Sequence, residues 1–400
     1  MIREVAGRVR ELVGTIDSGM GSFGYSARVQ RAASIAELRR WARIRAPRAV
    51  FDYVDGAAER EVSLRSSRTS WDRVRFLPKA LRDVSEVDTS VTVLGRHYGQ
   101  PFGLGPTGFT RLMHADGEIA VARAAAACGV PYVLSTVGTT TPEELAAAGN
   151  LSDPWFQLYL WKDRAASKEL VDRARAAGFY ALVLTIDVPV AGNRLRDIRN
   201  GLTIPPSVSL ATIAEGALHP LWLIDVLASD PVRFATLSSQ RSGAAEIVNQ
   251  MFDPSITTKD VEWLRSVWNG PIVVKGVQSV EDVSLLVSIG VDGVVLSNHG
   301  GRQLDRSPLP LSLLRPVLDT VGDRIDVLLD GGVMSGADAV AGIALGAKMV
   351  LVGRAYLYGL MAGGLPGVER ALAILASEAK RTMQLLGARS IAELEGMATF

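Results

Sequence analysis

The stretch "DGVVLSNHG" (residues 292–300) is an apolar run that ends in polar side chains and a glycine. It is one of a series of similar runs, and segments with helical periodicity lie between them. The others are "PFGLGPTG" (101–108), "PYVLSTVG" (131–138), "PWFQLYL" (154–160), "YALVLTIDVPV" (180–190), "PIVVKG" (271–276), "IDVLLDGG" (325–332) and "AKMVLVGR" (347–354). Strands that are apolar on both faces and alternate with helices are typical of a closed parallel barrel. We therefore predict an α/β fold, a (β/α)8 TIM barrel, with an open doubly wound sheet as the alternative.

Two segments lie outside this repeat. Residues 36–95 predict a helical and extended entry region, and residues 191–257 form a long insertion between the fourth strand and the helix that follows it. Insertions of this length in a compact domain are usually lids or disordered segments. We divide the chain into an N-terminal extension (1–35), a barrel domain (36–390) that includes the insertion, and a C-terminal tail (391–400).

The composition excludes several classes of protein. The chain has 400 residues, 48% of them hydrophobic, and a formal net charge of +1, so we expect a large core and no nucleic-acid partner. The single cysteine, Cys128, excludes a disulfide framework and a cysteine-rich metal site, and we expect no metal. The N-terminus lacks the apolar region of a secretory signal, and we expect no membrane-spanning run. These features indicate a cytoplasmic protein.

Each predicted strand ends in polar side chains. They are Thr107, Ser135, Gln157 with Tyr159, Thr185 with Asp187, Lys275, Ser297 with His299, Asp330 and Arg354. In barrels of this kind the chemistry lies at the carboxyl ends of the strands. One serine or threonine at such a position is usually only a satisfied polar residue, but polar residues at every strand end together indicate a site.

Glycines follow the last two predicted strands. Barrels commonly bind phosphate there, and Gly331, Gly332 and Gly353 would let backbone N–H groups approach an anion beside Arg354. We therefore expect a phosphorylated ligand, with ordinary turn chemistry as the alternative. The stretch "GLGPTG" (103–108) matches G-x-G-x-x-G, but it lies within a strand and we expect no helix start after it, so it gives no support for NAD.

The stretch "SNHGGRQLD" (297–305) resembles the active-site signature of the FMN-dependent α-hydroxy-acid oxidases and dehydrogenases. The resemblance runs from about residue 36 to about residue 390 and, within the family, is greatest to bacterial L-lactate dehydrogenases that do not use NAD. It includes "FDYVDGAAE", "PTGFTRLMHADGE", "WFQLYLWKDR", "LTIDVPVAGNRLRDIRNG", "VVKGV", "LLDGG" and "GRAYLYG". It implies an FMN-binding barrel that oxidises a small L-2-hydroxy acid, such as L-lactate to pyruvate, and passes electrons to a quinone or cytochrome.

The resemblance also implies a role for individual residues. The catalytic set is His299, Asp187, Tyr159, Tyr53 and Lys275. His299 is the expected base, Asp187 its hydrogen-bond partner, and Lys275 the cation beside flavin N1. Arg194, Arg302, Tyr53 and Tyr159 are expected to bind the substrate, the arginines through its carboxylate. The flavin ring is expected to contact Thr107, Gly108, Ser135, Gln157, Thr185, Lys275 and Ser297. The ribityl and phosphate end of FMN is expected to contact Asp330, Gly331, Gly332, Gly353 and Arg354.

Three positions bear on what the resemblance implies. Met334 stands where many members have a phosphate-binding arginine, and Val137 where glycolate oxidase has a tryptophan. Gly108 stands where many oxidases of the family have alanine, which favours a dehydrogenase.

Alternatives and partners stay open at this point. The alternatives are an oxidase that uses oxygen and produces hydrogen peroxide, a Schiff-base lyase at Lys275, and a barrel that binds phosphate without catalysis. Family members are commonly homotetramers, so an oligomer is expected. The apolar stretch 205–228 predicts lid packing, with peripheral contact to the inner face of the cell membrane as the alternative.

Overall fold

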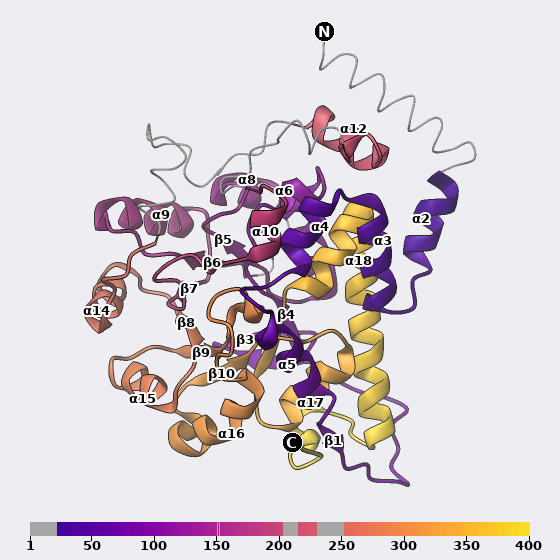
Figure 1. Cartoon of the computed structure of the whole chain (residues 1–400). Helices are drawn as coiled ribbons and strands as arrows, with labels where there is room; N and C mark the ends of the chain where they lie inside the picture. Colours follow the sequence, from indigo (N-terminus) through magenta and orange to yellow (C-terminus); the bar gives the residue numbers. More distant parts are fainter. Residues whose placement is uncertain (1–21, 150, 152, 203–214, 230–251) are drawn as a thin grey trace.

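The computed structural model describes residues 22–149, 151, 153–202, 215–229 and 252–400 (Figure 1). Residues 1–21 of the predicted N-terminal extension lie outside the described residues. So do residues 203–214 and 230–251 of the predicted insertion, which include part of the apolar stretch 205–228.

A parallel barrel forms the centre of the molecule. Its strands are β4 (Phe102–Leu104), β5 (Val133–Ser135), β6 (Trp155–Leu158), β7 (Ala181–Thr185), β8 (Ile272–Val277), β9 (Gly293–Leu296), β10 (Asp326–Leu329) and β11 (Met349–Val352). They pair in the order β4-β11-β10-β9-β8-β7-β6-β5. A parallel bridge between Leu104 and Tyr132 joins the two ends of this order and closes the barrel. The predicted (β/α)8 fold is confirmed, and each strand lies within its predicted run except β8, which extends one residue beyond it to Val277.

The strands direct alternate side chains into the barrel. Residues pointing inward form one buried apolar cluster, which includes Val133, Trp155, Val183, Val273, Val295 and Leu328. Side chains on a strand alternate between its two faces with a period of two. Ser135, Gln157, Thr185, Lys275, Ser297 and Asp330 each follow one of these inward residues by two positions. The polar strand ends therefore lie above the interior cluster, at one mouth of the barrel.

Helices surround the strands. They are α7 (Gly117–Cys128), α8 (Pro142–Ala147), α9 (Arg164–Ala176), α14 (Thr258–Val267), α15 (Val280–Ser288), α16 (Pro310–Val321), α17 (Gly336–Ala344) and α18 (Arg354–Leu386), with the short η3 (Gly322–Arg324) after α16. Thr141 caps α8 in a capping box with Glu144. A one-turn helix, α6 (Thr110–Met113), follows "GLGPTG", so the expectation of no helix start there was wrong.

The N-terminal segment consists of α2 (Ser22–Gln30), α3 (Ile35–Arg45), α4 (Arg48–Asp55) and α5 (Val62–Trp71). Pro47 separates α3 from α4, because the residue before a proline avoids the helical conformation. The hairpin of β2 (Val91–Val93) and β3 (Arg96–Tyr98) packs its side chains against the interior cluster of the barrel. Near the C-terminus, η4 (Ile391–Leu394) precedes β12 (Ala398–Thr399), which pairs with β1 (Arg75–Phe76).

The long insertion after β7 contains two described helices, α10 (Leu195–Arg199) and α12 (Pro220–Ala228). In Figure 1, α12 lies at the outside of the fold, and α10 lies close to α4. Among the described helices, α18 is long and apolar enough to cross a membrane by length and composition. Most of its apolar side chains are buried, and it packs against α3, α7 and α17.

Candidate active site

A large pocket opens at the barrel mouth where the polar strand ends meet. Its empty space, including the part open to solvent, is about 1260 Å³. Predicted site residues that line it are Tyr53, Thr107, Gly108, Ser135, Tyr159, Arg194, Lys275, His299, Arg302, Asp330, Gly331, Gly332, Gly353 and Arg354. Four others, Gln157, Thr185, Asp187 and Ser297, are not in the wall and lie behind it in the strand ends.

His299 and Asp187 form a hydrogen-bonded pair. His299 Nδ1 lies 3.0 Å from Asp187 Oδ1. Burial disfavours the charge on Asp187, but the neighbouring His299 and Lys275 outweigh it and lower the pKa of the carboxyl group. An ionised Asp187 holds the proton on Nδ1, so the other ring nitrogen, Nε2, is available to accept a proton from a ligand.

The loop that carries His299 turns sharply. His299, Gly300 and Gly301 form a 3-10 helix, η2, with φ angles of 56°, 61° and 77°. A Cβ atom at Gly301 would lie 2.7 Å from the backbone nitrogen of Leu64, so only glycine fits there. This turn places Arg302 in the same pocket as His299.

Arg302 has no ion-pair partner among the described residues. Its guanidinium donates to the backbone oxygens of Tyr53 and Gly56 and lies 4.8 Å above the Tyr53 ring. Burial and the nearby Arg194 lower the pKa of Arg302 to about 10. Arg194 enters from the insertion and is paired with Asp197 at 2.6 Å. Two neighbouring guanidinium groups, one of them without a counter-ion, favour binding of a carboxylate.

Lys275 is buried and paired. Its Nζ atom lies 3.1 Å from Asp330 Oδ2 and donates to Ser297 Oγ at 3.0 Å. Burial disfavours the ammonium ion, but Asp330 and Asp187 outweigh it and raise the pKa of Lys275. Lys275 is therefore a fixed cation in the pocket wall. Burial, followed by the charge of Asp187, also raises the pKa of Tyr159, so its hydroxyl stays protonated.

Several buried polar atoms at the barrel mouth have no hydrogen-bond partner among the described residues. They are Gln157 Nε2, Thr185 Oγ1, Asp187 Oδ2, Asn298 Oδ1 and Asp330 Oδ1. Buried polar atoms are nearly always paired, so these atoms indicate a polar ligand. The edge of a flavin ring carries carbonyl and N–H groups that match such donors and acceptors, and the residues present therefore fit a flavin.

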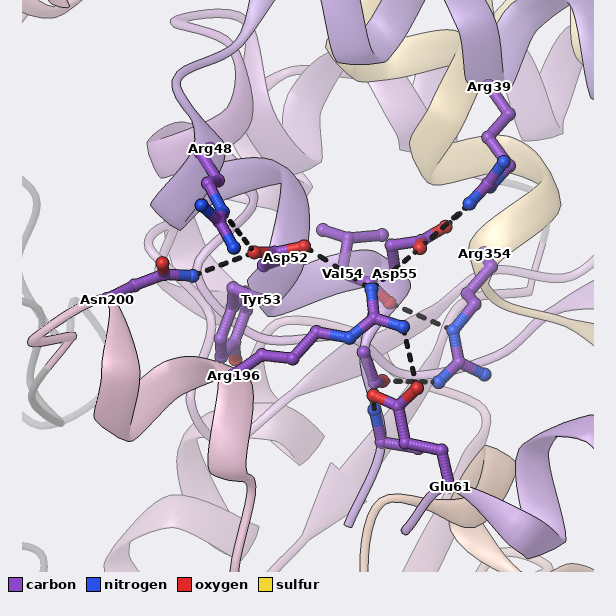
Figure 2. Close-up of polar contacts among 12 residues, drawn as sticks. Arg39, Arg48, Asp52, Tyr53, Val54, Asp55, Glu61, Arg196, Asn200 and Arg354 are labelled. Atoms are coloured by element: carbon purple, nitrogen blue, oxygen red, sulfur yellow. Dashed lines mark hydrogen bonds and ion pairs between the residues drawn. The ribbon is translucent and has the colours of Figure 1, made fainter. Parts of the chain in front are cut away.

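The predicted phosphate end lies beside the N-terminus of α18. Gly353 is its N-cap residue, and a Cβ atom there would meet nothing closer than 4.0 Å, so an anion can approach the backbone. Arg354 donates to the backbone oxygen of Val54 at 2.9 Å (Figure 2) and to those of Gly56 and Gly300 at 2.8 and 3.0 Å. These bonds use three of its five N–H groups.

Some residues of the pocket were missed by the sequence prediction. Phe252 and Val188 line the wall, and the Phe252 ring lies 6.3 Å from that of Tyr159. Gly276 lies beneath Asp187, where a Cβ atom would be 2.5 Å from the carboxyl carbon. An isolated glycine in a strand often marks close approach of another group, and "VVKGV" contains that signal. Nothing in the sequence marks Phe252.

Oxidation of an α-hydroxy acid with a flavin requires a base, a cationic site for the carboxylate and polar contacts for the flavin, and this barrel mouth contains side chains suited to each. The chain belongs to the FMN-dependent dehydrogenase family, whose profile matches residues 42–399. The match confirms the predicted family, the class of enzyme and FMN as the cofactor.

Relatives cover almost the whole chain. A protein of Mycobacterium tuberculosis, named provisionally as an L-lactate dehydrogenase, is 50% identical over 388 residues, or 97% of this chain and 94% of that protein. The L-lactate dehydrogenase of Caulobacter vibrioides is 41% identical over 369 residues, or 90% of this chain and 96% of that protein. The crystal structure of a monotopic membrane protein, (S)-mandelate dehydrogenase, is similar with a TM-score of 0.87 at 38% identity, covering 92% of this chain and 99% of the other.

Proposed function

We propose that this chain oxidises a small L-2-hydroxy acid, L-lactate to pyruvate, and passes the electrons to a quinone or cytochrome. The observation that carries the proposal is one pocket that contains the His299–Asp187 pair and the two arginines. The names of the relatives from Mycobacterium tuberculosis and Caulobacter vibrioides support lactate as the substrate.

Oxidation of lactate removes two electrons and two protons from the substrate. When bound, FMN accepts the two electrons. His299 would take a proton through Nε2, and Asp187 would stabilise the imidazolium that forms. Arg194 and Arg302 would hold the carboxylate, with the hydroxyls of Tyr53 and Tyr159 beside the polar atoms of the substrate.

Residues of the pocket wall, with Gln157, Thr185 and Ser297 behind it, would hold the cofactor. Thr107, Gly108, Ser135, Gln157, Thr185, Lys275 and Ser297 would bind the ring, and Asp330, Gly331, Gly332, Gly353 and Arg354 the ribityl and phosphate end. The unpaired donors of Gln157 and Thr185 support this assignment. The paired Lys275 ammonium is a poor nucleophile, which argues against the Schiff-base lyase.

L-Lactate and (S)-mandelate distinguish the two classes of substrate that the names of the relatives suggest, the aliphatic and the aromatic hydroxy acids. Phe252, Val137 and Val188 contribute apolar wall to the pocket, which suits an apolar substituent on the hydroxy acid, and the names of the relatives favour a methyl group there. A screen under anaerobic conditions with L-lactate, D-lactate and (S)-mandelate tests this by bleaching of the flavin absorbance. We expect the fastest bleaching with L-lactate. Faster bleaching with (S)-mandelate would assign the chain to the aromatic acids, and no bleaching with any of them would refute the proposed function.

The acceptor is tested separately. Gly108 leaves no methyl group at the strand end where many oxidases of the family have alanine, which supports a dehydrogenase. The fully reduced enzyme, mixed with air-saturated buffer, should reoxidise slowly, and a quinone should reoxidise it fast. Reoxidation by oxygen faster than reduction by substrate would make this chain an oxidase that produces hydrogen peroxide.

The outer face of α12 supports a peripheral membrane contact. Trp222 is buried and donates to the backbone oxygen of Leu112, whereas Leu227, Leu218 just before the helix and Ile44, whose backbone oxygen contacts His219, are exposed. The similar (S)-mandelate dehydrogenase is described as a monotopic membrane protein. Co-sedimentation with anionic lipid vesicles that is lost in Leu218→Ser/Leu227→Ser would support membrane contact. If the wild type does not co-sediment, lid packing remains the role of this segment.

The proposed function also includes assembly into a homotetramer, which light scattering would test.

A further inference from the structure

Arg196 lies outside the pocket, two residues after Arg194. Arg194 is the N-cap residue of α10, and Arg196 is the second residue of that helix. Arg194 lines the pocket, whereas Arg196 is not among the lining residues and points toward α4 (Figure 2).

Arg196 contacts three carboxylates from the N-terminal segment. Its Nη1 atom lies 3.1 Å from Asp55 Oδ2 and 3.3 Å from Asp52 Oδ1, and Nη2 lies 2.6 Å from Glu61 Oε2 (Figure 2). The side chains of the three acids are only 8–15% exposed. Carboxylates this buried need a cation or several donors. One guanidinium therefore joins the insertion to the end of α4 and the start of α5.

Two of the carboxylates that pair with Arg196 flank a pocket residue in the sequence. Asp52 and Asp55 lie on either side of Tyr53 in α4. The backbone oxygens of Tyr53 and Gly56, at the C-terminal end of α4, accept hydrogen bonds from Arg302. The position of α4 therefore sets the positions of Tyr53 and Arg302. Because Arg196 binds α4 and lies two residues after Arg194, it also fixes where Arg194 lies relative to those two residues.

Strained backbone between α4 and α5 supports a role for the contact between Arg196 and the three carboxylates. Glu59 and Glu61 have φ angles of 47° and 59°, a region that non-glycine residues seldom occupy. Both side chains bind the segment that carries Arg194: Asn193 donates to Glu59 at 2.8 Å, and Arg196 binds Glu61. Ala58 donates to the backbone oxygen of Gly301 in the histidine loop. The strained segment therefore contacts both the insertion and the histidine loop.

We propose that Arg196 is a positioning residue for the substrate carboxylate, which holds Arg194 at a set distance from Tyr53 and Arg302. The inference rests on the proposed function for the identity of the substrate, but not for the presence of an anion site. Arg196 acts through Arg194, and its loss lets α10 move away from α4 while the barrel remains intact.

The chain offers a matched control. Arg39 binds the same carboxylate, Asp55, at 2.5 and 2.9 Å and is similarly exposed, at 44% against 32% for Arg196. Arg39 lies on α3, and its ion pair with Asp55 does not involve the insertion. Arg39→Gln therefore removes one cation from the same network without releasing Arg194.

The test measures oxalate binding to the holoenzyme by the change in flavin absorbance, together with KM and kcat for L-lactate. Arg196→Gln should weaken oxalate binding and raise KM by about ten-fold or more, with a smaller change in kcat. Arg39→Gln should stay within about two-fold of wild type. In an Arg194→Lys background, Arg196→Gln should add little, because both changes disturb the same contact.

Three results would overturn the proposal: normal oxalate binding in Arg196→Gln, an equal loss in Arg39→Gln, or fully additive effects with Arg194→Lys. If Arg196→Gln does not retain flavin, Arg196→Lys takes its place. It keeps the charge but meets fewer carboxylates, so weaker oxalate binding supports the proposal and wild-type binding overturns it. A wild type that binds oxalate but does not oxidise L-lactate would refute the proposed substrate and leave the role of Arg196 testable.

Discussion

His299 Nδ1 lies 3.0 Å from Asp187 Oδ1, although 112 residues separate the two along the chain. Asp187 follows β7 and His299 follows β9, and β8 lies between these strands in the barrel. Contact across β8 is possible because β8 carries Gly276, over which the Asp187 side chain lies. The pair therefore depends on the fold and on one residue without a side chain.

Substitution of Gly276 should separate this pair. A Cβ atom at position 276 would lie 2.5–2.7 Å from the Asp187 side chain, and the φ angle of 98° disfavours any other residue. We expect Gly276→Ala to retain FMN but to lose about 10²-fold or more in the rate of flavin reduction. The rate is measured by anaerobic stopped-flow absorbance. Gly99→Ala, where the nearest atom is 3.7 Å away, is the control and should react like wild type.

The two arginines should contribute through the shape of the guanidinium group as well as its charge. Arg194→Lys and Arg302→Lys keep the charge but lose the two-pronged contact, and each should cost about 1–3 kcal/mol in transition-state binding. The cost is obtained from kcat/KM. Arg199→Lys, on the exposed face of α10, serves as control. If both substitutions in the pocket match wild type, the carboxylate is bound elsewhere.

Gly108 and Val137 should be coupled. A Cβ atom at Gly108 would lie 2.5 Å from Val137 Cγ2, and a β-branched side chain has little freedom to move aside. Gly108→Ala should therefore strain the pocket by about 1–3 kcal/mol and weaken FMN binding, as measured by release of flavin on dilution. Val137→Ala removes the contacting methyl group, so the double variant should bind FMN more tightly than Gly108→Ala. If Gly108→Ala and the double variant bind FMN equally, positions 108 and 137 are independent.

Acid should destabilise the protein through Asp55. Burial disfavours the ionised form of this carboxyl group, but Arg39, Tyr358 and Arg196 outweigh it and lower its pKa. A folded-state pKa below that of the unfolded chain stabilises the fold above about pH 4, and this stabilisation is lost as the pH falls through the folded value. In denaturant unfolding, Asp55→Asn should be less stable than wild type at neutral pH, and the difference should shrink toward pH 3. A constant difference would mean that ionisation of Asp55 does not contribute.

The sequence was most informative where the barrel imposes a simple rule. Lys275 and Ser297 follow inward-facing valines by two residues, so periodicity alone predicts that they reach the mouth. Contacts made by the insertion follow no such period. Arg196 resembles any exposed helical arginine until α4 brings its two aspartates and Glu61 beside it. Gly108 and Val137 likewise became a pair only when β4 and β5 closed the barrel.

The most direct test of the account compares flavin reduction by L-lactate in the wild type and in His299→Gln, mixed anaerobically in a stopped-flow instrument. Glutamine retains a polar side chain of similar reach but accepts no proton at neutral pH. We predict that the variant keeps its FMN and its fold and reduces the flavin about 10³-fold more slowly, or slower still. A variant that reduces its flavin at close to the wild-type rate would contradict the role of His299 as the base.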